Sequence, residues 1–251
     1  MQVVNLFVLD LCFHHNGQKQ CLHPVVLQQG NETILVDCGY PGFLPLLEAA
    51  VAKHNLSLQQ LTGVLITHHD NDHMGALAEL KEHYPQIRVY ASAEDVPYIS
   101  GSKKSLRLQQ AEDLFPCLPD EQKEGALQFQ EMLKAVRPVA VDETLAEGAI
   151  PFLPGVEVVF TPGHMPGHLS LYLEKEKILV ATDAVVCENG ELNIANPDFT
   201  LDLPAAVESV KKLRVMDIDK LVCYHGGVLD INIAQGLNSL LAKFSPSTTT
   251  L

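Results

Sequence analysis

Residues 67 to 73 read Thr67-His68-His69-Asp70-Asn71-Asp72-His73 and place five side chains that can bind a metal ion within six consecutive positions. The run directly before them, Gly63-Val64-Leu65-Ile66, is nearly all apolar, which is typical of a strand covered on both faces. A loop at the carboxyl end of such a strand opens to the crevice in which α/β sheets usually bind ligands. The stretch therefore predicts an α/β fold with a metal site at one edge of a sheet.

Three further polar positions follow apolar strands in the same way. His164 lies in the loop Thr161–His168, after a β-branched run. Asp183 ends the run that starts at Ile178, and His225 follows the last predicted strand. Neutral imidazoles and carboxylates are ligands of zinc, iron and manganese, so we expect these strand ends to bind metal together. The alternative is a set of hydrogen-bonded loop residues.

The rest of the chain alternates between segments typical of strands and of helices. The predicted strands are residues 25–27, 33–36, 63–67, 87–91, 156–161, 169–173, 178–181 and 221–224. The predicted helices are residues 44–54, 75–83 and 203–213. Two of these strand pairs form hairpins, and Ile34–Asp37 resembles Ile178–Asp183. The pattern predicts two similar halves, each with a sheet and helices on its outer face.

Residues 94–136 differ from their surroundings, because they are polar, contain few β-branched residues and are helix-like around 125–135. We expect a helical insertion that either covers the site as a lid or packs on the sheet as a further layer. Lys103, Lys104 and Arg107 in this insertion could recognise an anionic substrate, and a solvated surface is the simpler interpretation. The low-complexity segment 245–251 is expected to be a disordered tail.

Composition and charge disfavour several classes of protein. Of 251 residues, 47% are hydrophobic and 19% are charged, which is too apolar for a disordered chain. The chain has 17 Lys and Arg against 31 Asp and Glu, and its net charge of −14 argues against nucleic acid or an acidic membrane surface as a partner. No run approaches the length of a membrane-spanning helix, and residues 1–10 lack the basic region of a signal peptide.

The cysteines are widely spread and form no Cys-x-x-Cys pair: Cys12, Cys21, Cys38, Cys117, Cys187 and Cys223. Disulfide-stabilised secreted proteins are short and dense in cysteine, so we expect these thiols to be reduced. The expected location is the cytoplasm.

The metal-binding pattern resembles that of the metallo-β-lactamase fold superfamily, whose hallmark is His-x-His-x-Asp-His followed by a distant His, an Asp and a last His. The matching positions are His68, Asp70, Asp72, His73, His164, Asp183 and His225. The loop Thr161–His168 and the strand end Asp37-Cys38-Gly39 are also similar to motifs of this family. The resemblance implies a four-layer αβ/βα sandwich of two mixed β-sheets with outer helices, formed as a single domain by residues 1–244.

Carried over residue by residue, the resemblance implies two sites for divalent metal ions. The first would consist of His68, Asp70 and His164, and the second of Asp72, His73 and His225, with Asp183 bridging the two. Asp70 stands where the family usually has its second histidine. This extra carboxylate leaves one net positive charge at the centre instead of two, which favours iron or manganese beside zinc as the bound ions.

The resemblance also implies hydrolysis, since a bound metal lowers the pKa of its water to near neutrality. A hydroxide bridging the two ions would attack a small ester, lactone or thioester, and the candidate catalytic residues are Asp72, Asp183 and His168. His168 would act through a hydrogen bond to a ligand or to the backbone. Lactonases of the family typically have a tyrosine three residues after the bridging aspartate, where this chain has Val186. The expected partner is a small-molecule substrate, and the protein is expected to be a monomer or homodimer.

Two other functions remain open. One is a di-iron or mononuclear iron redox enzyme of the same superfamily, either similar to oxygen or nitric-oxide reductases or a dioxygenase. Flavo-diiron reductases carry a glutamate at the position of Asp70, but they also carry a fused flavodoxin domain, so a redox role would need a separate electron donor. The other is a binding module that kept its metals without catalysis.

Overall fold

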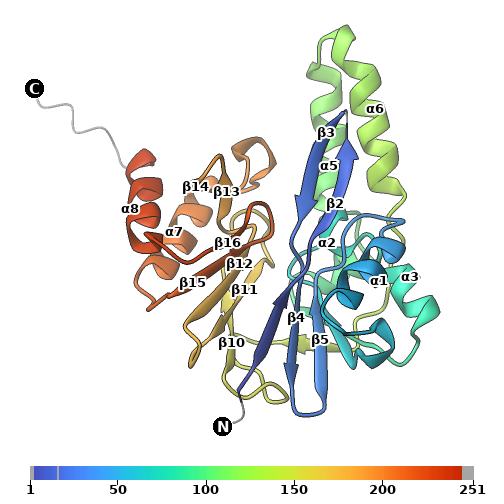
Figure 1. Cartoon of the computed structure of the whole chain (residues 1–251). Helices are drawn as coiled ribbons and strands as arrows, with labels where there is room; N and C mark the ends of the chain where they lie inside the picture. Colours follow the sequence, from blue (N-terminus) through green and yellow to red (C-terminus); the bar gives the residue numbers. More distant parts are fainter. Residues whose placement is uncertain (1–2, 16, 245–251) are drawn as a thin grey trace, which may run out of the picture. The chain divides into compact units, whose positions relative to one another are not determined.

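The computed structural model describes residues 3–15 and 17–244 (Figure 1). They form two compact units, each with its own six-stranded mixed sheet. The N-terminal unit contains the described residues of 5–20 and 24–146, and the C-terminal unit contains 3–4, 21–23 and 147–244. The α/β class with two mixed sheets is as predicted. The tail predicted at 245–251 lies outside the described residues, and a single domain over 1–244 stays a prediction.

The sheet of the N-terminal unit has the strand order β1-β4-β5-β6-β7-β8. Its strands are β1 (Asn5–Val8), β4 (Val25–Gln29), β5 (Glu32–Val36), β6 (Gly63–Leu65), β7 (Arg88–Ser92) and β8 (Glu143–Leu145). The strands β1, β4 and β5 pair antiparallel, whereas β5 to β8 pair parallel. The first helices of this unit are α1 (Leu44–Ala52), η1 (Leu58–Gln60), α2 (Asn71–Met74) and α3 (Leu77–His83).

The pairing of β5 with β6 positions the loop that follows β6, which is the predicted metal-binding loop. The predicted hairpin is confirmed, since Val25 pairs with Val36 across β4 and β5. All three residues of β6 are buried, as its apolar sequence predicts. Because β5 and β6 are parallel, their carboxyl ends meet at one edge of the sheet, and the Asp37 amide donates to the Leu65 carbonyl at 2.9 Å. The residues that follow the two strands are therefore neighbours.

The predicted insertion at 94–136 is helical, as expected. It contains α4 (Val96–Ile99), α5 (Leu106–Leu114), η2 (Phe115–Cys117) and α6 (Asp120–Lys134). The helices α5 and α6 run side by side as a hairpin (Figure 1). Gln130 of α6 donates from its side-chain amide to the Ala111 carbonyl of α5 at 3.1 Å, which ties the two helices together.

The sheet of the C-terminal unit has the strand order β16-β15-β12-β11-β10-β9. Its strands are β9 (Gly148–Ala149), β10 (Val156–Phe160), β11 (Leu169–Leu173), β12 (Ile178–Thr182), β15 (Lys220–Cys223) and β16 (Gly227–Leu229). A separate hairpin is formed by β13 (Val186–Glu188) and β14 (Glu191–Asn193), and the helices are η3 (Pro197–Phe199), α7 (Leu203–Arg214) and α8 (Ile233–Lys243). Buried apolar residues of α7 and α8 pack with those of β12, β14 and β15 into one core.

The resemblance between the two halves is confirmed in the strand pairing. In the N-terminal unit the hairpin β4–β5 is followed by the parallel neighbour β6, and in the C-terminal unit the hairpin β11–β12 is followed by the parallel neighbour β15. A residue other than glycine has positive φ at the carboxyl end of the second strand of each hairpin: Asp37, directly after β5, at 61°, and Thr182, the last residue of β12, at 48°. This conformation is rare outside glycine and often marks a functional site.

The prediction that all cysteines are reduced thiols is wrong for Cys12 and Cys21, which are disulfide-bonded. They lie on β2 (Leu11–His15) and β3 (Gln18–Leu22), two strands that form a small sheet of their own. The sequence of this hairpin carries no regular alternation of apolar and polar residues, so the pairing of its two strands was not predicted. Among the described residues, Cys38, Cys117, Cys187 and Cys223 are free thiols.

The helix α8 was not predicted, although its sequence carries the signal. Its buried residues Ile233, Leu237 and Leu240 repeat at helical spacing. Within the part of the chain that the structure describes, no helix combines the length and the apolar character that crossing a membrane would take.

Candidate metal centre

The N-terminal unit presents four of the predicted metal ligands on one loop and the helix that follows it. His68 and Asp70 lie between β6 and α2, and Asp72 and His73 lie in α2 itself. The Nε2 atom of His68 is 3.5 Å from Asp70 Oδ2, and the Nε2 atom of His73 is 3.7 Å from Asp72 Oδ2. The rings of His68 and His73 have centroids 3.9 Å apart. The loop therefore brings its imidazoles together.

Asp37 holds this loop in place from the end of β5. Its buried carboxylate accepts hydrogen bonds from the Thr67 amide at 2.9 Å, the Thr67 hydroxyl at 2.7 Å and His73 Nδ1 at 2.8 Å. Burial raises the pKa of Asp37, and the neighbouring His73 imidazole and the Thr67 donors oppose that increase. Asp37, directly after β5, thus binds both Thr67, which begins the predicted metal-binding stretch, and His73, which ends it.

The same network orients both imidazoles. His73 Nδ1 bears the hydrogen that it donates to Asp37, so Nε2 is the nitrogen with the lone pair. The Thr67 hydroxyl gives its own hydrogen to Asp37, so its oxygen accepts from His68 Nδ1 at 3.2 Å. His68 thus also presents the lone pair of Nε2. A carboxylate behind a metal-binding histidine commonly sets its tautomer in this way.

The next two residues of the loop contact the insertion. His69 Nδ1 lies 3.0 Å from Asp95 Oδ1, and the His69 ring stacks on Tyr98 with centroids 4.4 Å apart. Asp70 forms a buried ion pair with Arg107 of α5. His69 therefore packs against residues of the insertion. The interpretation of Arg107 as part of a solvated surface is wrong, because hydropathy alone does not reveal that a carboxylate 37 residues away in sequence pairs with it.

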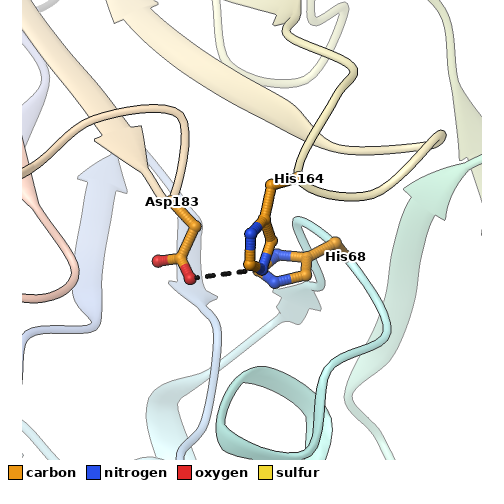
Figure 2. Close-up of side chains that lie close together, drawn as sticks. All are labelled: His68, His164 and Asp183. Carbon is orange, nitrogen blue, oxygen red and sulfur yellow. Dashed lines mark ion pairs between the residues drawn. The ribbon is translucent and has the colours of Figure 1, made fainter. Parts of the chain in front are cut away.

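The C-terminal unit presents the other three predicted ligands around one carboxylate. Asp183 Oδ2 lies 3.6 Å from His164 Nε2 and 3.6 Å from His225 Nε2. Figure 2 shows the His164 and Asp183 side chains with their ion pair dashed, and it also draws His68, which belongs to the N-terminal unit. His164 and Asp183 are buried, whereas the side chain of His225 is 37% exposed.

The loop before His164 needs glycine at position 163. Gly163 has φ +135°, and a Cβ there would meet the backbone nitrogen of Ala206 in α7 at 2.2 Å. Replacing Gly163 by alanine is therefore expected to lower the free energy of unfolding by about 3 kcal/mol, since strain and overpacking add. The matched control is Gly148→Ala, because Gly148 also has positive φ but an added Cβ there would meet nothing within 4 Å. Chemical denaturation of both variants measures the difference, and equal losses would show that the contact with α7 is unimportant.

His168 binds the backbone of Asp183. It is fully buried, and its Nε2 accepts from the Asp183 amide at 3.2 Å. Since Nε2 is an acceptor, Nδ1 bears the hydrogen and donates to the Thr161 hydroxyl at 2.8 Å. The Thr182 hydroxyl also lies 2.8 Å from Nε2. These contacts place the backbone at the end of β12, and with it the carboxylate of Asp183.

Two residues next to His225 are part of the core. Tyr224 is buried, as its position in the strand alternation predicts. Cys223 is also buried, and burial raises the pKa of its thiol far above the usual range, so it remains a neutral thiol. Val186, at the position where lactonases of the family typically have tyrosine, is buried at the start of β13.

The donor atoms have the spacing that a metal ion requires. Two ligand atoms that are each about 2.1 Å from one tetrahedral ion lie about 3.4 Å apart. The four imidazole–carboxylate pairs within the two units are separated by 3.5, 3.7, 3.6 and 3.6 Å. Imidazole nitrogen and carboxylate oxygen are ligands of zinc, iron and manganese alike. The residues present in each unit therefore fit a divalent metal ion.

Comparison with known proteins agrees with this donor set. The profile of the metallo-beta-lactamase superfamily matches residues 23–225. A probable metallo-hydrolase of Bacillus subtilis, YflN, is 29% identical over 208 residues, which cover 77% of this chain and 75% of that protein. An N-acyl homoserine lactonase of Bacillus thuringiensis is 33% identical over 108 residues, covering 41% of this chain and 42% of the lactonase.

The fold is also that of solved structures. The crystal structure of a metallo-beta-lactamase family protein from Thermus thermophilus superimposes with a TM-score of 0.74 at 24% identity, covering 95% of this chain and 79% of that one. A metallo-beta-lactamase from Pontibacter korlensis gives a TM-score of 0.65 at 16% identity, covering 96% and 99% of the two chains. At these identities the likeness concerns the fold, which is the one predicted.

Proposed function

The chain belongs to the metallo-β-lactamase superfamily and is a metallo-hydrolase, and on that premise we propose that its predicted ligands hold two divalent metal ions for the hydrolysis of a small ester, lactone or thioester. One ion would be held by His68, His164 and Asp183, and the other by Asp72, His73 and His225 with Asp183 between them. The observation that carries the proposal is the repeated spacing of imidazole and carboxylate atoms within each unit.

When bound, such ions lower the pKa of a water molecule to near neutrality and stabilise negative charge on the reacting oxygens. The residues of the chain would bind these ions and orient the ligand atoms. Asp37 fixes the tautomers of His68 and His73, and His168 fixes the backbone of Asp183. Asp72 and Asp183 add negative charge that compensates the cations. His168 is fully buried, so we assign it the role of a positioning residue.

The substrate class rests on the relatives and on the chemistry of the site. Two aspartates and four histidines supply metal ligands without a serine or cysteine nucleophile, which suits attack by water on an acyl carbon. The N-acyl homoserine lactonase supports a lactone. Val186 lies where lactonases of the family typically have a tyrosine, which favours an open-chain ester or thioester.

Metal analysis and activity on the same preparation test this proposal. We expect protein purified without added ions to contain up to two equivalents of zinc, iron or manganese and to cleave p-nitrophenyl esters, lactones or thioesters. A chelator should abolish the turnover, and a divalent ion should restore it. Iron with oxygen consumption and no hydrolysis would support the alternative, an iron-dependent redox enzyme, and would overturn the proposal. A protein that binds no divalent ion would also overturn it.

A further inference from the structure

Both carboxylate oxygens of Asp70 are held by one guanidinium. Arg107 Nε donates to Oδ1 at 3.1 Å, and Nη2 donates to Oδ2 at 2.8 Å, so the pair is bidentate. The third nitrogen, Nη1, donates to Gln110 Oε1 at 2.6 Å. The side chains of Arg107 and Asp70 are 3% and 7% exposed, so little water screens the pair. Bidentate arginine–carboxylate pairs are among the strongest side-chain interactions in proteins.

The ion pair with Arg107 alters the expected role of Asp70, which stands where the family usually has a histidine. Its negative charge is offset by a buried arginine, so the centre does not gain the extra carboxylate charge that the sequence implied. A metal ion bound to Asp70 would also place a divalent cation next to the guanidinium, which is unfavourable away from water. Oδ2 nonetheless lies 3.5 Å from His68 Nε2, a spacing that two ligands of one ion share, so the distance alone does not decide.

Asp70 directly precedes α2, the helix that bears the predicted ligands Asp72 and His73. The backbone carbonyl of Asp70 accepts from the amides of His73 and Met74, both at 3.0 Å. Asp70 is the N-cap residue of α2, but its side chain makes no capping hydrogen bond. Aspartate at this position usually caps the helix. Here the Asp70 side chain binds Arg107 instead, so a residue of α5 fixes the start of α2.

A second contact joins the same two segments. The amide of Leu106, the first residue of α5, donates to His69 Nε2 at 3.4 Å. His69 therefore bears its hydrogen on Nδ1 and donates to Asp95. Two consecutive residues of the metal-binding loop, His69 and Asp70, are thus bound by two consecutive residues of the insertion, Leu106 and Arg107.

We propose that Arg107 is a positioning residue of the metal centre: its ion pair with Asp70 anchors the insertion to the loop that bears His68, Asp72 and His73, and Asp70 serves this anchor and is not a metal ligand. The proposal rests on the proposed function, since it assigns metal binding to the loop. It places the start of the insertion in a fixed position. Any lid movement would therefore be confined to the part beyond Arg107.

The first test uses the metal-free protein, so that it does not depend on the proposed function. Asp70→Asn and Arg107→Gln are each expected to lower the melting temperature of the apo protein by about 5 to 15 °C, because each leaves a buried charge without compensation. The double variant should melt no lower than the less stable single variant, since the two residues act as one pair. The matched control is Arg137→Gln, because Arg137 forms an exposed bidentate pair with Glu82. We expect its change to be within about 2 °C.

The second test separates an anchor from a ligand. We expect Asp70→Asn and Arg107→Gln to weaken zinc binding by the same factor of about 10, with Arg107→Lys recovering part of the loss. The absorption spectrum of the Co²⁺-substituted Asp70→Asn variant should keep the bands of the parent protein, whereas His68→Ala should change them. If Asp70 is a ligand, Asp70→Asn alone will alter the spectrum and Arg107→Gln will leave zinc affinity unchanged or raise it.

The outcomes distinguish a failure of this proposal from a failure of the proposed function. Altered cobalt bands in Asp70→Asn, or additive losses of melting temperature in the double variant, would overturn the anchor. A parent protein that binds no metal would overturn the proposed function and the metal-positioning role of Arg107. In that case, non-additive losses of melting temperature in the apo single and double variants would still show that Asp70 and Arg107 form a stabilising pair.

Discussion

Asp183→Asn is expected to lower kcat/KM by about 1,000-fold or more and to remove at least one equivalent of bound metal. Asparagine keeps the size of the side chain but loses the negative charge that lies 3.6 Å from both His164 Nε2 and His225 Nε2. If one carboxylate serves two cations, its neutralisation weakens both sites at once. Metal analysis and kinetics on the best substrate measure the two losses in the same preparation.

The control for this variant is Asp217→Asn, which removes the same charge from the same unit. Asp217 pairs with Lys177 at an exposed position, and its side chain is 72% exposed. We expect the control to keep full activity and metal content. A variant at Asp183 that kept the parent's metal content and turnover would show that the carboxylate does not join the two ions.

Asp37→Asn is expected to weaken metal binding by about 10- to 100-fold, the usual effect of losing the partner behind a metal-binding histidine. The carboxylate accepts three hydrogen bonds, from the Thr67 amide, the Thr67 hydroxyl and His73 Nδ1. An amide nitrogen in place of Oδ2 cannot accept from the last two. His73 would lose the hydrogen bond that leaves the Nε2 lone pair available. His68 would be affected in the same way through Thr67.

Competition with a chromophoric zinc chelator measures the affinity of the protein for zinc, which is the quantity that we expect Asp37→Asn to lower. The matched control is Asp142→Asn in the same unit, since Asp142 Oδ2 also accepts from a backbone amide, that of Val89 at 2.7 Å, but contacts no predicted ligand. We expect zinc affinity of the control to equal that of the parent. An unchanged affinity in Asp37→Asn would contradict the orienting role of Asp37.

Much of the fold could be predicted because its signals are local. The hairpins β4–β5 and β11–β12 have β-branched strands around short polar turns, and both formed as expected. The apolar run of β6 predicted a buried central strand. The hairpin of β2 and β3 was missed because its sequence shows no regular alternation of apolar and polar residues, and the disulfide-bonded state of Cys12 and Cys21 was missed with it.

The chemical nature of the candidate site was present in the sequence by itself. His68, Asp72, His73, His164, Asp183 and His225 each follow a strand, and strand ends are where such folds bind ligands. The ion pair of Asp70 could be seen only in the tertiary structure. Its carboxylate binds Arg107, a residue of a polar helix for which hydropathy predicts a solvated surface. Residue type and spacing along a strand determine which donors are available, whereas the partner of a buried charge depends on which distant segment packs against it.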